Sequence, residues 1–247
     1  MGELKTPSST PPLGSSSGSG VSGPQNVKSK LVFVGDCGCG KTSLIKRYMG
    51  EDFTPEYTPT GFDTYTTTYE VSEAYTIQLS LWDTSGKDEY CRVRPLSYSD
   101  ADIILLCYSI GSQESIDNVV SKWYPEIREN CPNQPIILVG CQRDLRDYKS
   151  TEKIKKKDRT GVTYEQGMKA AKTIDAVMFT EVSAKASKKS VKDVIEVAAM
   201  SSAGLKTEKK NSTFRRRRSS FHRKRYSEMS DSKRVLRNDV AKSCVLM

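Results

Sequence analysis

A glycine-rich motif directly after a short apolar run constrains this chain more than any other feature. The run at residues 31–34, Leu-Val-Phe-Val, has the length and composition of a buried strand. It leads into Gly35-Asp-Cys-Gly-Cys-Gly40-Lys41-Thr42, which fits the pattern G-x-x-x-x-G-K-[ST]. An ordinary glycine-rich turn would need neither a strand before it nor a helical stretch after it. We therefore interpret residues 35–42, called the phosphate loop below, as a site for a nucleotide phosphate chain.

The chemistry of the phosphate loop follows from its residue types. Glycines let the backbone curl so that successive N–H groups face phosphate oxygens, and the next helix adds positive potential. Lys41 is placed to reach the β- and γ-phosphates, and the Thr42 hydroxyl is a ligand for Mg²⁺. The predicted nucleotide-binding residues of this segment are Gly35, Asp36, Cys37, Gly38, Cys39, Gly40, Lys41, Thr42 and Ser43.

The positive charge of the chain is confined to one end. The 247 residues include 39 Lys or Arg and 30 Asp or Glu, a net charge of +9. Residues 206–243 hold 14 of the basic and 4 of the acidic residues, or +10, so the rest of the chain carries −1. Residues 1–26 contain 16 Ser, Gly or Pro, and the hydrophobic share of 36% is low for a compact domain. We predict a disordered extension at 1–27, one folded domain at 28–205 and a basic tail at 206–247.

Several classes of protein are excluded by composition. No apolar run approaches the roughly 20 residues of a membrane helix. Residues 1–26 are too polar for a signal peptide, which predicts a cytosolic or nuclear protein. The seven cysteines lack paired C-x-x-C spacing, and the one histidine, His222, lies in the basic tail. We therefore expect neither a disulfide framework nor a histidine-ligated metal.

Strand and helix patterns alternate between the two ends. Strands are predicted at residues 64–71, 75–82, 102–110, 135–140 and 177–182, besides 31–34. Helical spacing joins Ile116, Val119, Val120, Trp123 and Ile127, and again Val191, Val194, Ile195 and Ala198. This alternation predicts an α/β layer fold with a mainly parallel sheet, in which only 64–71 and 75–82, joined by a short turn, pair antiparallel.

A phosphate loop alone does not separate a nucleotide kinase, an ATPase and a GTPase. Asp83-Thr-Ser-Gly86 follows an alternating strand, where the carboxylate can hold Mg²⁺ through water and Gly86 can meet the γ-phosphate. Thr60 lies between the phosphate loop and that strand, where a second hydroxyl ligand for Mg²⁺ is expected. The predicted metal ligands are thus Thr42, Thr60 and, through water, Asp83.

Two further motifs indicate guanine as the base. Cys141-Gln142-Arg143-Asp144 follows the strand at 135–140, and the Asp144 carboxylate can accept two N–H bonds from the guanine edge. Glu181-Val-Ser183-Ala184-Lys185 ends the last predicted strand, and the Ala184 N–H can donate to the guanine carbonyl. Each motif is short, but their order and their positions at strand ends together favour a guanine-nucleotide site.

These motifs together resemble the Rho family of small GTPases over residues 28–205. The ending Cys244-Val-Leu-Met247 fits the C-a-a-X pattern of that family, and the Lys-rich segment 147–161 resembles its extra helical insert. Leu81-Trp-Asp-Thr-Ser-Gly86 and Ala241-Lys-Ser-Cys244 are most similar to the Rnd subfamily. The resemblance implies a six-stranded, mostly parallel sheet with five helices that binds GTP or GDP with Mg²⁺.

The resemblance also assigns roles to individual positions. It implies that Phe53 flanks the base and that Tyr57 and Thr60 belong to switch I. The implied effector-binding surface is Phe62, Asp63 and Tyr65. The nucleotide contacts outside the phosphate loop are then Phe53, Tyr57, Thr60, Asp83, Gly86, Gln142, Asp144, Ser183, Ala184 and Lys185.

Departures from the family pattern predict weak or absent GTP hydrolysis. Lys87 stands where most members have a glutamine that orients the attacking water, and lysine has no acceptor for a water proton. Cys37 stands at a loop position that is glycine in most cycling GTPases, where a side chain crowds a GAP's arginine finger. Gln142 replaces a lysine that packs over the base, which predicts lower affinity, and Gly61 replaces a β-branched residue, which loosens the effector loop.

The basic tail predicts a membrane anchor. Met at the end of the C-a-a-X pattern favours farnesylation of Cys244, and one lipid chain needs a second signal for stable anchoring. Basic residues of the tail supply about 1 kcal/mol each near an anionic leaflet. Ser219, Ser220 and Ser227 each follow a basic residue three positions upstream, which suits a basophilic kinase. A nuclear localisation signal and non-specific nucleic-acid binding remain the alternatives for such a tail.

We therefore expect a constitutively GTP-bound, Rho-like signalling protein at the cytoplasmic face of the plasma membrane and partly in the cytosol. It would act through effectors on the actin cytoskeleton and cell shape, as a monomer without a specific nucleic-acid partner. Two alternatives stay open, a catalytically active GTPase that cycles with exchange factors and GAPs, and a nuclear or nucleic-acid-binding protein.

Overall fold

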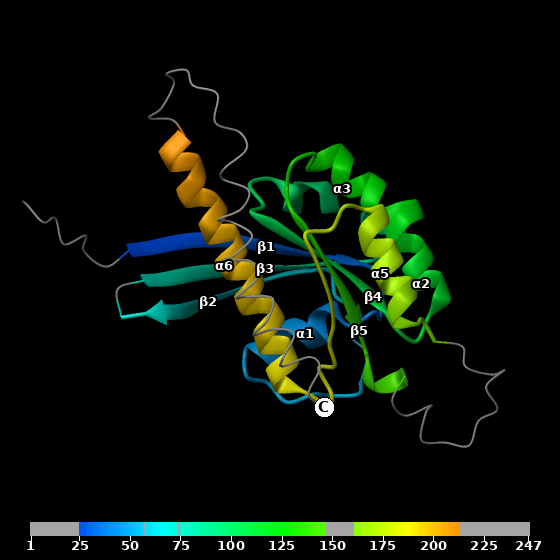
Figure 1. Ribbon diagram of the computed structural model, residues 1–247. Coiled ribbons are helices and arrows are strands. Elements are labelled where there is room, and N and C mark those ends of the chain that lie inside the picture. Colours follow the sequence, from blue (N-terminus) through cyan, green and yellow to red (C-terminus); the bar gives the residue numbers. More distant parts are fainter. Residues whose placement is uncertain (1–24, 57, 74, 147–160, 213–247) are drawn as a thin grey trace, which may run out of the picture.

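A six-stranded sheet in the order β2-β3-β1-β4-β5-β6 forms the centre of the molecule (Figure 1). The computed structural model describes residues 25–56, 58–73, 75–146 and 161–212. Only β2 and β3 pair antiparallel, and every other pair is parallel. The prediction of a mainly parallel α/β sheet with one antiparallel pair is confirmed. The strands are β1 (Gln25–Gly35), β2 (Phe62–Ser72), β3 (Tyr75–Thr84), β4 (Ile103–Ser109), β5 (Ile136–Cys141) and β6 (Met178–Glu181).

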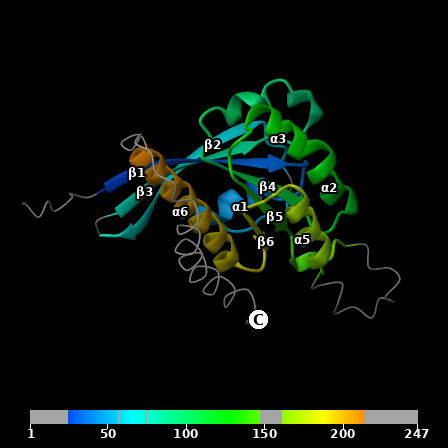
Figure 2. The ribbon, with the colours of Figure 1, turned by 45° about the horizontal axis from the view of Figure 1, so that its top comes forward.

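Helices cover both faces of this sheet (Figures 1 and 2). On one face, α1 (Lys41–Tyr48) and α6 (Lys188–Ser212) pack against β1 and β3, and α6 lies across both strands. The other face is covered by α5 (Tyr164–Thr173) and by a continuous helical segment made of α2 (Gln113–Asn118), η3 (Val119–Trp123) and α3 (Tyr124–Asn130). Two 3-10 turns, η1 (Asp88–Tyr90) and η2 (Arg94–Tyr98), follow β3.

Apolar side chains fill the two layers between sheet and helices. All seven residues of β4 are buried, as its continuous apolar sequence requires for a strand covered on both faces. Ile77, Leu79 and Leu81 alternate along β3 and are fully buried on one face, as predicted. The four spaced residues of α6, Val191, Val194, Ile195 and Ala198, are likewise buried.

One residue of the predicted helix pattern lies outside the core. Ile116, Val119, Trp123 and Ile127 are buried, but Val120 is 37% exposed, so its predicted place on the apolar face is wrong. The reason is that Val119–Trp123 form a π-helical turn, which is wider than an α-turn and changes the angular spacing of the residues within it.

The fold brings the predicted motifs to one edge of the sheet. Parallel strands place their carboxyl ends side by side, and β1, β3, β5 and β6 each lead there into a segment with a predicted motif. The folded elements extend slightly beyond residues 28–205, since β1 begins at Gln25 and α6 continues to Ser212. No helix in the described ranges is long and apolar enough to cross a bilayer.

Candidate nucleotide-binding site

The phosphate loop connects the end of β1 to the start of α1. Gly35, Gly38 and Gly40 have φ angles of 144°, 67° and 110°, in the region that favours glycine. A Cβ on Gly35 would lie 2.1 Å from the Cys107 carbonyl oxygen of β4, so no larger residue fits there. The ammonium of Lys41 is buried and donates to the carbonyl oxygens of Gly35 and Asp36, at 2.8 Å each. The loop therefore encloses its own lysine, as a phosphate-binding loop does.

Three oxygen-bearing side chains meet beside this loop. The Thr42 hydroxyl donates to Asp83 Oδ2 at 2.6 Å, and the Thr42 and Thr60 hydroxyl oxygens are 2.8 Å apart. Asp83 is 1% exposed, and its other oxygen, Oδ1, has no hydrogen-bond partner among the described residues. Burial raises the pKa of Asp83, while the Thr42 bond and the Lys41 charge oppose that rise. Hard oxygens with one unsatisfied carboxylate oxygen suit Mg²⁺ and its water ligands.

Two loops after β5 and β6 form the other end of the site. We call residues 142–146 and 182–186 the base loops. The Ser183 hydroxyl donates to Asp144 Oδ1 at 2.5 Å and accepts from the N–H of Ala186. Gln142 has a φ of 61° and donates from Nε2 to the Gly38 carbonyl at 2.9 Å. Gln142 therefore ties the first base loop to the phosphate loop.

A cavity of about 450 Å³ joins the phosphate loop, the segment before β2 and the base loops. Its volume is that of a small-molecule site. Most of the predicted nucleotide-binding residues line it, which brings together segments far apart in sequence. They are Cys37, Gly38, Gly40, Lys41, Thr42, Ser43, Phe53, Thr60, Gly86, Gln142, Asp144, Ala184 and Lys185.

Other predicted residues support the cavity from behind. The Asp36 carboxylate turns away and accepts from Trp123 Nε1 at 2.9 Å. Cys39 is 1% exposed and points toward the Cys107 carbonyl of β4. Ser183 contacts Asp144, and Asp83 contacts Thr42. Gly35, the first residue of the phosphate loop, packs against Cys107 of β4.

The predicted effector residues at the start of β2 differ in exposure. Asp63 is exposed and also borders the cavity. Phe62 is half-buried, and its ring contacts Tyr90 edge-on with centroids 5.4 Å apart. Tyr65 is half-buried and packs against the core between the sheet and α6. Of the three, Asp63 is thus the most accessible to a partner.

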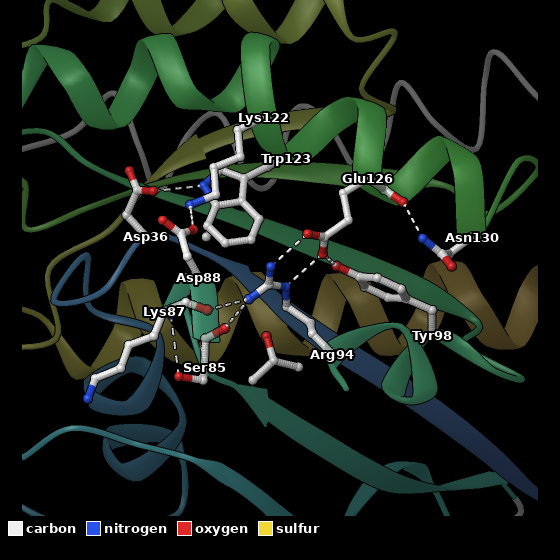
Figure 3. A network of polar contacts seen from close by, with 12 residues as sticks. Asp36, Ser85, Lys87, Asp88, Arg94, Tyr98, Lys122, Trp123, Glu126 and Asn130 are labelled. Atoms are coloured by element: carbon white, nitrogen blue, oxygen red, sulfur yellow. Dashed lines mark hydrogen bonds and ion pairs between the residues drawn. The ribbon is translucent and has the colours of Figure 1, made fainter. Parts of the chain in front are cut away.

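A buried arginine organises the segment that carries Lys87 (Figure 3). Arg94 is fully buried and forms two bonds with the Glu126 carboxylate, at 2.6 and 2.7 Å. It also donates to the carbonyl oxygens of Ser85 and Lys87, at 2.8 and 3.2 Å, and stacks over the Trp123 ring. In Figure 3 the Lys87 side chain extends away from this cluster. Lys87 is not among the residues that line the cavity. The position where a glutamine is expected to orient the attacking water therefore places no hydrogen-bond acceptor in the cavity.

Sequence patterns did not reveal several residues of this arrangement. Ser109, at the end of β4, donates to Gln142 Oε1 at 2.5 Å, and Cys141 packs against Gly40. Ser109 lies inside a predicted strand and Cys141 inside a predicted motif, but a serine or cysteine at a strand end carries no specific signal. Several predicted residues lie outside the described ranges, namely Tyr57, most of the 147–161 insert, Ser219, Ser220, Ser227 and Cys244.

Comparison with known proteins agrees with this geometry. Residues 30–203 match the sequence profile of the Ras family. The chain belongs to the Ras family. It is 42% identical over 226 residues to the Rho-related GTP-binding protein RhoE of Homo sapiens. This match covers 90% of this chain and 92% of the relative. It is also 41% identical over 190 residues to the GTP-binding protein RHO1 of Candida albicans, covering 76% and 95%. The protein is therefore a Rho-like GTP-binding protein whose family binds guanine nucleotides and acts through effector proteins.

Proposed function

We propose that this Rho-like protein stays GTP-bound because it hydrolyses GTP very slowly. The observation that carries the proposal is the identity of two residues: Lys87 stands where a water-orienting glutamine is expected, and Cys37 stands in the phosphate loop where glycine is expected. Lysine donates but does not accept hydrogen bonds, so it cannot orient an attacking water as glutamine does. Cys37 is exposed and lines the cavity, so its side chain occupies space that an arginine finger from a GAP would need.

The rest of the site supports tight phosphate binding without fast chemistry. Thr42, Thr60 and Asp83 would hold Mg²⁺, the last through water, and Lys41 would contact the β- and γ-phosphates. The ion would neutralise charge on these phosphates when bound. Asp144 would accept from the guanine edge, with Ser183 holding its carboxylate and Ala184 donating from the backbone. Phe53 would lie beside the base.

Hydrolysis in a single turnover tests this proposal. Loaded with GTP, the unmodified protein should show barely measurable hydrolysis, with or without a Rho GAP. The double variant Lys87→Gln with Cys37→Gly should recover more activity than either single variant, because both positions shape one water-and-arginine site. If a GAP accelerates hydrolysis by the unmodified protein about a hundredfold, the protein is a cycling switch instead.

The base is tested separately by competition between nucleotides. Asp144→Asn should weaken GTP binding and relax the preference for guanine, because the amide presents a donor where guanine also presents donors. If ATP competes as well as GTP for the unmodified protein, Asp144 does not read guanine.

We infer further that the protein acts as a monomer at the cytoplasmic face of the plasma membrane, through effectors that control actin and cell shape. The support is the +10 charge of residues 206–243 beside Cys244, the expected farnesylation site. A single farnesyl chain binds reversibly, so the basic residues supply the second signal. Phosphorylation of Ser219, Ser220 and Ser227 would cancel roughly half of this charge and release the protein to the cytosol.

Cell fractionation of tail variants tests this location. Cys244→Ser should make the protein soluble, and changing the three serines to Glu should shift part of it to the cytosol relative to an Ala form. Equal membrane binding of the Glu and Ala forms would show that charge does not regulate location. Nuclear accumulation of the unmodified protein would favour the nuclear alternative.

A further inference from the structure

A mostly buried ion pair joins the first base loop to the end of β6, directly before the second base loop. Arg146 and Glu181 form a bidentate ion pair, with Arg146 NH1 2.6 Å from Glu181 Oε2 and Arg146 NH2 2.8 Å from Glu181 Oε1. The side chain of Glu181 is 6% exposed and that of Arg146 is 31% exposed. The planar guanidinium matches the carboxylate in two parallel bonds, which constrains both distance and orientation. The pair therefore fixes the geometry between the end of β6 and the segment after β5.

The positions of these residues relative to the site give the pair its significance. Arg146 lies two residues after Asp144, and Glu181 lies two residues before Ser183. Between them, the Arg143 N–H donates to the Val182 carbonyl at 3.1 Å, and Ser183 holds Asp144. Neither residue of the ion pair lines the cavity, whereas Val182 and Asp144 both do.

Arg146 also binds the chain where it returns from residues 147–161. Its Nε and NH2 both donate to the Val162 carbonyl, at 3.1 and 2.5 Å. One guanidinium therefore connects three segments, namely the first base loop, Val162 and β6. A lysine would keep the charge but has no planar fork for bonding Glu181 and Val162 together.

The Glu181 side chain packs beside buried residues of β4 and β5. Its side chain lies against Gly140, where an added Cβ would come within 3.2 Å of the Glu181 Cγ. The Tyr108 hydroxyl is close to the same glycine, is buried, and has no hydrogen-bond partner among the described residues. A carboxylate in such surroundings requires its cation, since an unpaired buried charge is strongly unfavourable.

We propose that Arg146 is a positioning residue for guanine recognition, which sets the orientation of the Asp144 carboxylate through its bonds to Glu181 and Val162. This inference rests on the proposed role of Asp144 in reading guanine. Arg146 does not line the cavity, so we assign it an indirect role through Asp144. It holds the two base loops at the separation in which Asp144 faces the base.

The experiment compares GTP with inosine triphosphate, which lacks the exocyclic amino group of guanine. Asp144 can distinguish the two only if its carboxylate is correctly placed. In Arg146→Gln, GTP should dissociate about tenfold faster, as expected for the loss of a charged hydrogen bond, and the preference for GTP over inosine triphosphate should shrink by a similar factor. Arg146→Lys should fall between this variant and the unmodified protein. Fluorescent nucleotide displacement measures both quantities.

Two controls separate positioning from general damage. Arg128 also donates to backbone carbonyls, at the opposite end of β5, with its NH1 2.9 Å from the Gln134 oxygen, so Arg128→Gln should leave the preference unchanged. Adding Glu181→Gln to Arg146→Gln should restore part of the GTP residence time, because it removes the unpaired carboxylate. If Arg146→Gln and Arg146→Lys keep the full preference for GTP over inosine triphosphate, Arg146 does not position Asp144. If the unmodified protein does not distinguish GTP from ATP, the proposed guanine site itself fails.

Discussion

Among single residues, Gly86 lies directly against the backbone of the phosphate loop. A Cβ at Gly86 would lie 2.4 Å from the Cys37 nitrogen and 2.5 Å from the Gly35 oxygen. Both are backbone atoms of the loop and cannot move aside without disturbing the phosphate site. Gly86→Ala should therefore weaken GTP binding by about tenfold or more, since small displacements of binding groups are costly. Gly61→Ala is the matched control, because its Cβ would meet only the Tyr90 hydroxyl at 3.9 Å. Equal affinities of the two variants in a fluorescence titration would contradict this reading.

At the same scale, the sequence predicted residues whose role depends on local backbone geometry. Gly40, Lys41 and Thr42 belong to a motif that follows from residue spacing alone, and the structure places all three around the cavity. The sequence did not predict that the Asp36 carboxylate accepts a hydrogen bond from Trp123, because these residues are 87 positions apart. Long-range side-chain pairs of this kind carry no periodic signal.

At the scale of elements, the Arg94–Glu126 pair connects η2 to α3. The two side chains are 1% and 17% exposed, and the Tyr98 hydroxyl also donates to Glu126. Arg94→Met should lower the free energy of unfolding by about 3–5 kcal/mol, because it leaves Glu126 without its cation. Combining it with Glu126→Gln should recover part of that loss. Urea denaturation at pH 7 measures both, and a single variant as stable as the unmodified protein would show that the pair contributes little.

Strand positions were the most predictable elements, and the irregular turns the least. β3 and β4 follow from alternation and from continuous apolar sequence, respectively. The π-turn at Val119–Trp123 and the 3-10 turns after β3 were not predicted. Their residues are held by tertiary contacts such as those of Trp123 with Arg94, which override local propensity.

At the scale of the whole molecule, buried and half-buried tyrosines predict a loss of stability in alkaline solution. Burial raises the pKa of Tyr48 to about 12 and also raises the pKa values of Tyr65, Tyr69, Tyr98 and Tyr108. In the unfolded chain a tyrosine ionises near pH 10, about its ordinary value. Between that pH and the raised folded values, the unfolded state binds fewer protons than the folded state. Stability is therefore fully present below about pH 10 and falls as the pH rises further.

Tyr108→Phe tests this explanation at one position. The Tyr108 hydroxyl is buried and unpartnered within the described ranges, so its removal breaks no described hydrogen bond. At pH 7 the variant should be as stable as the unmodified protein, or more stable by about 1 kcal/mol, because an unsatisfied buried polar group is lost. Above pH 10 its urea midpoint should fall less steeply. Tyr164→Phe, at a side chain that is 46% exposed, should leave the alkaline loss unchanged. An unaltered slope in Tyr108→Phe would show that ionisation of this tyrosine does not contribute to alkaline unfolding.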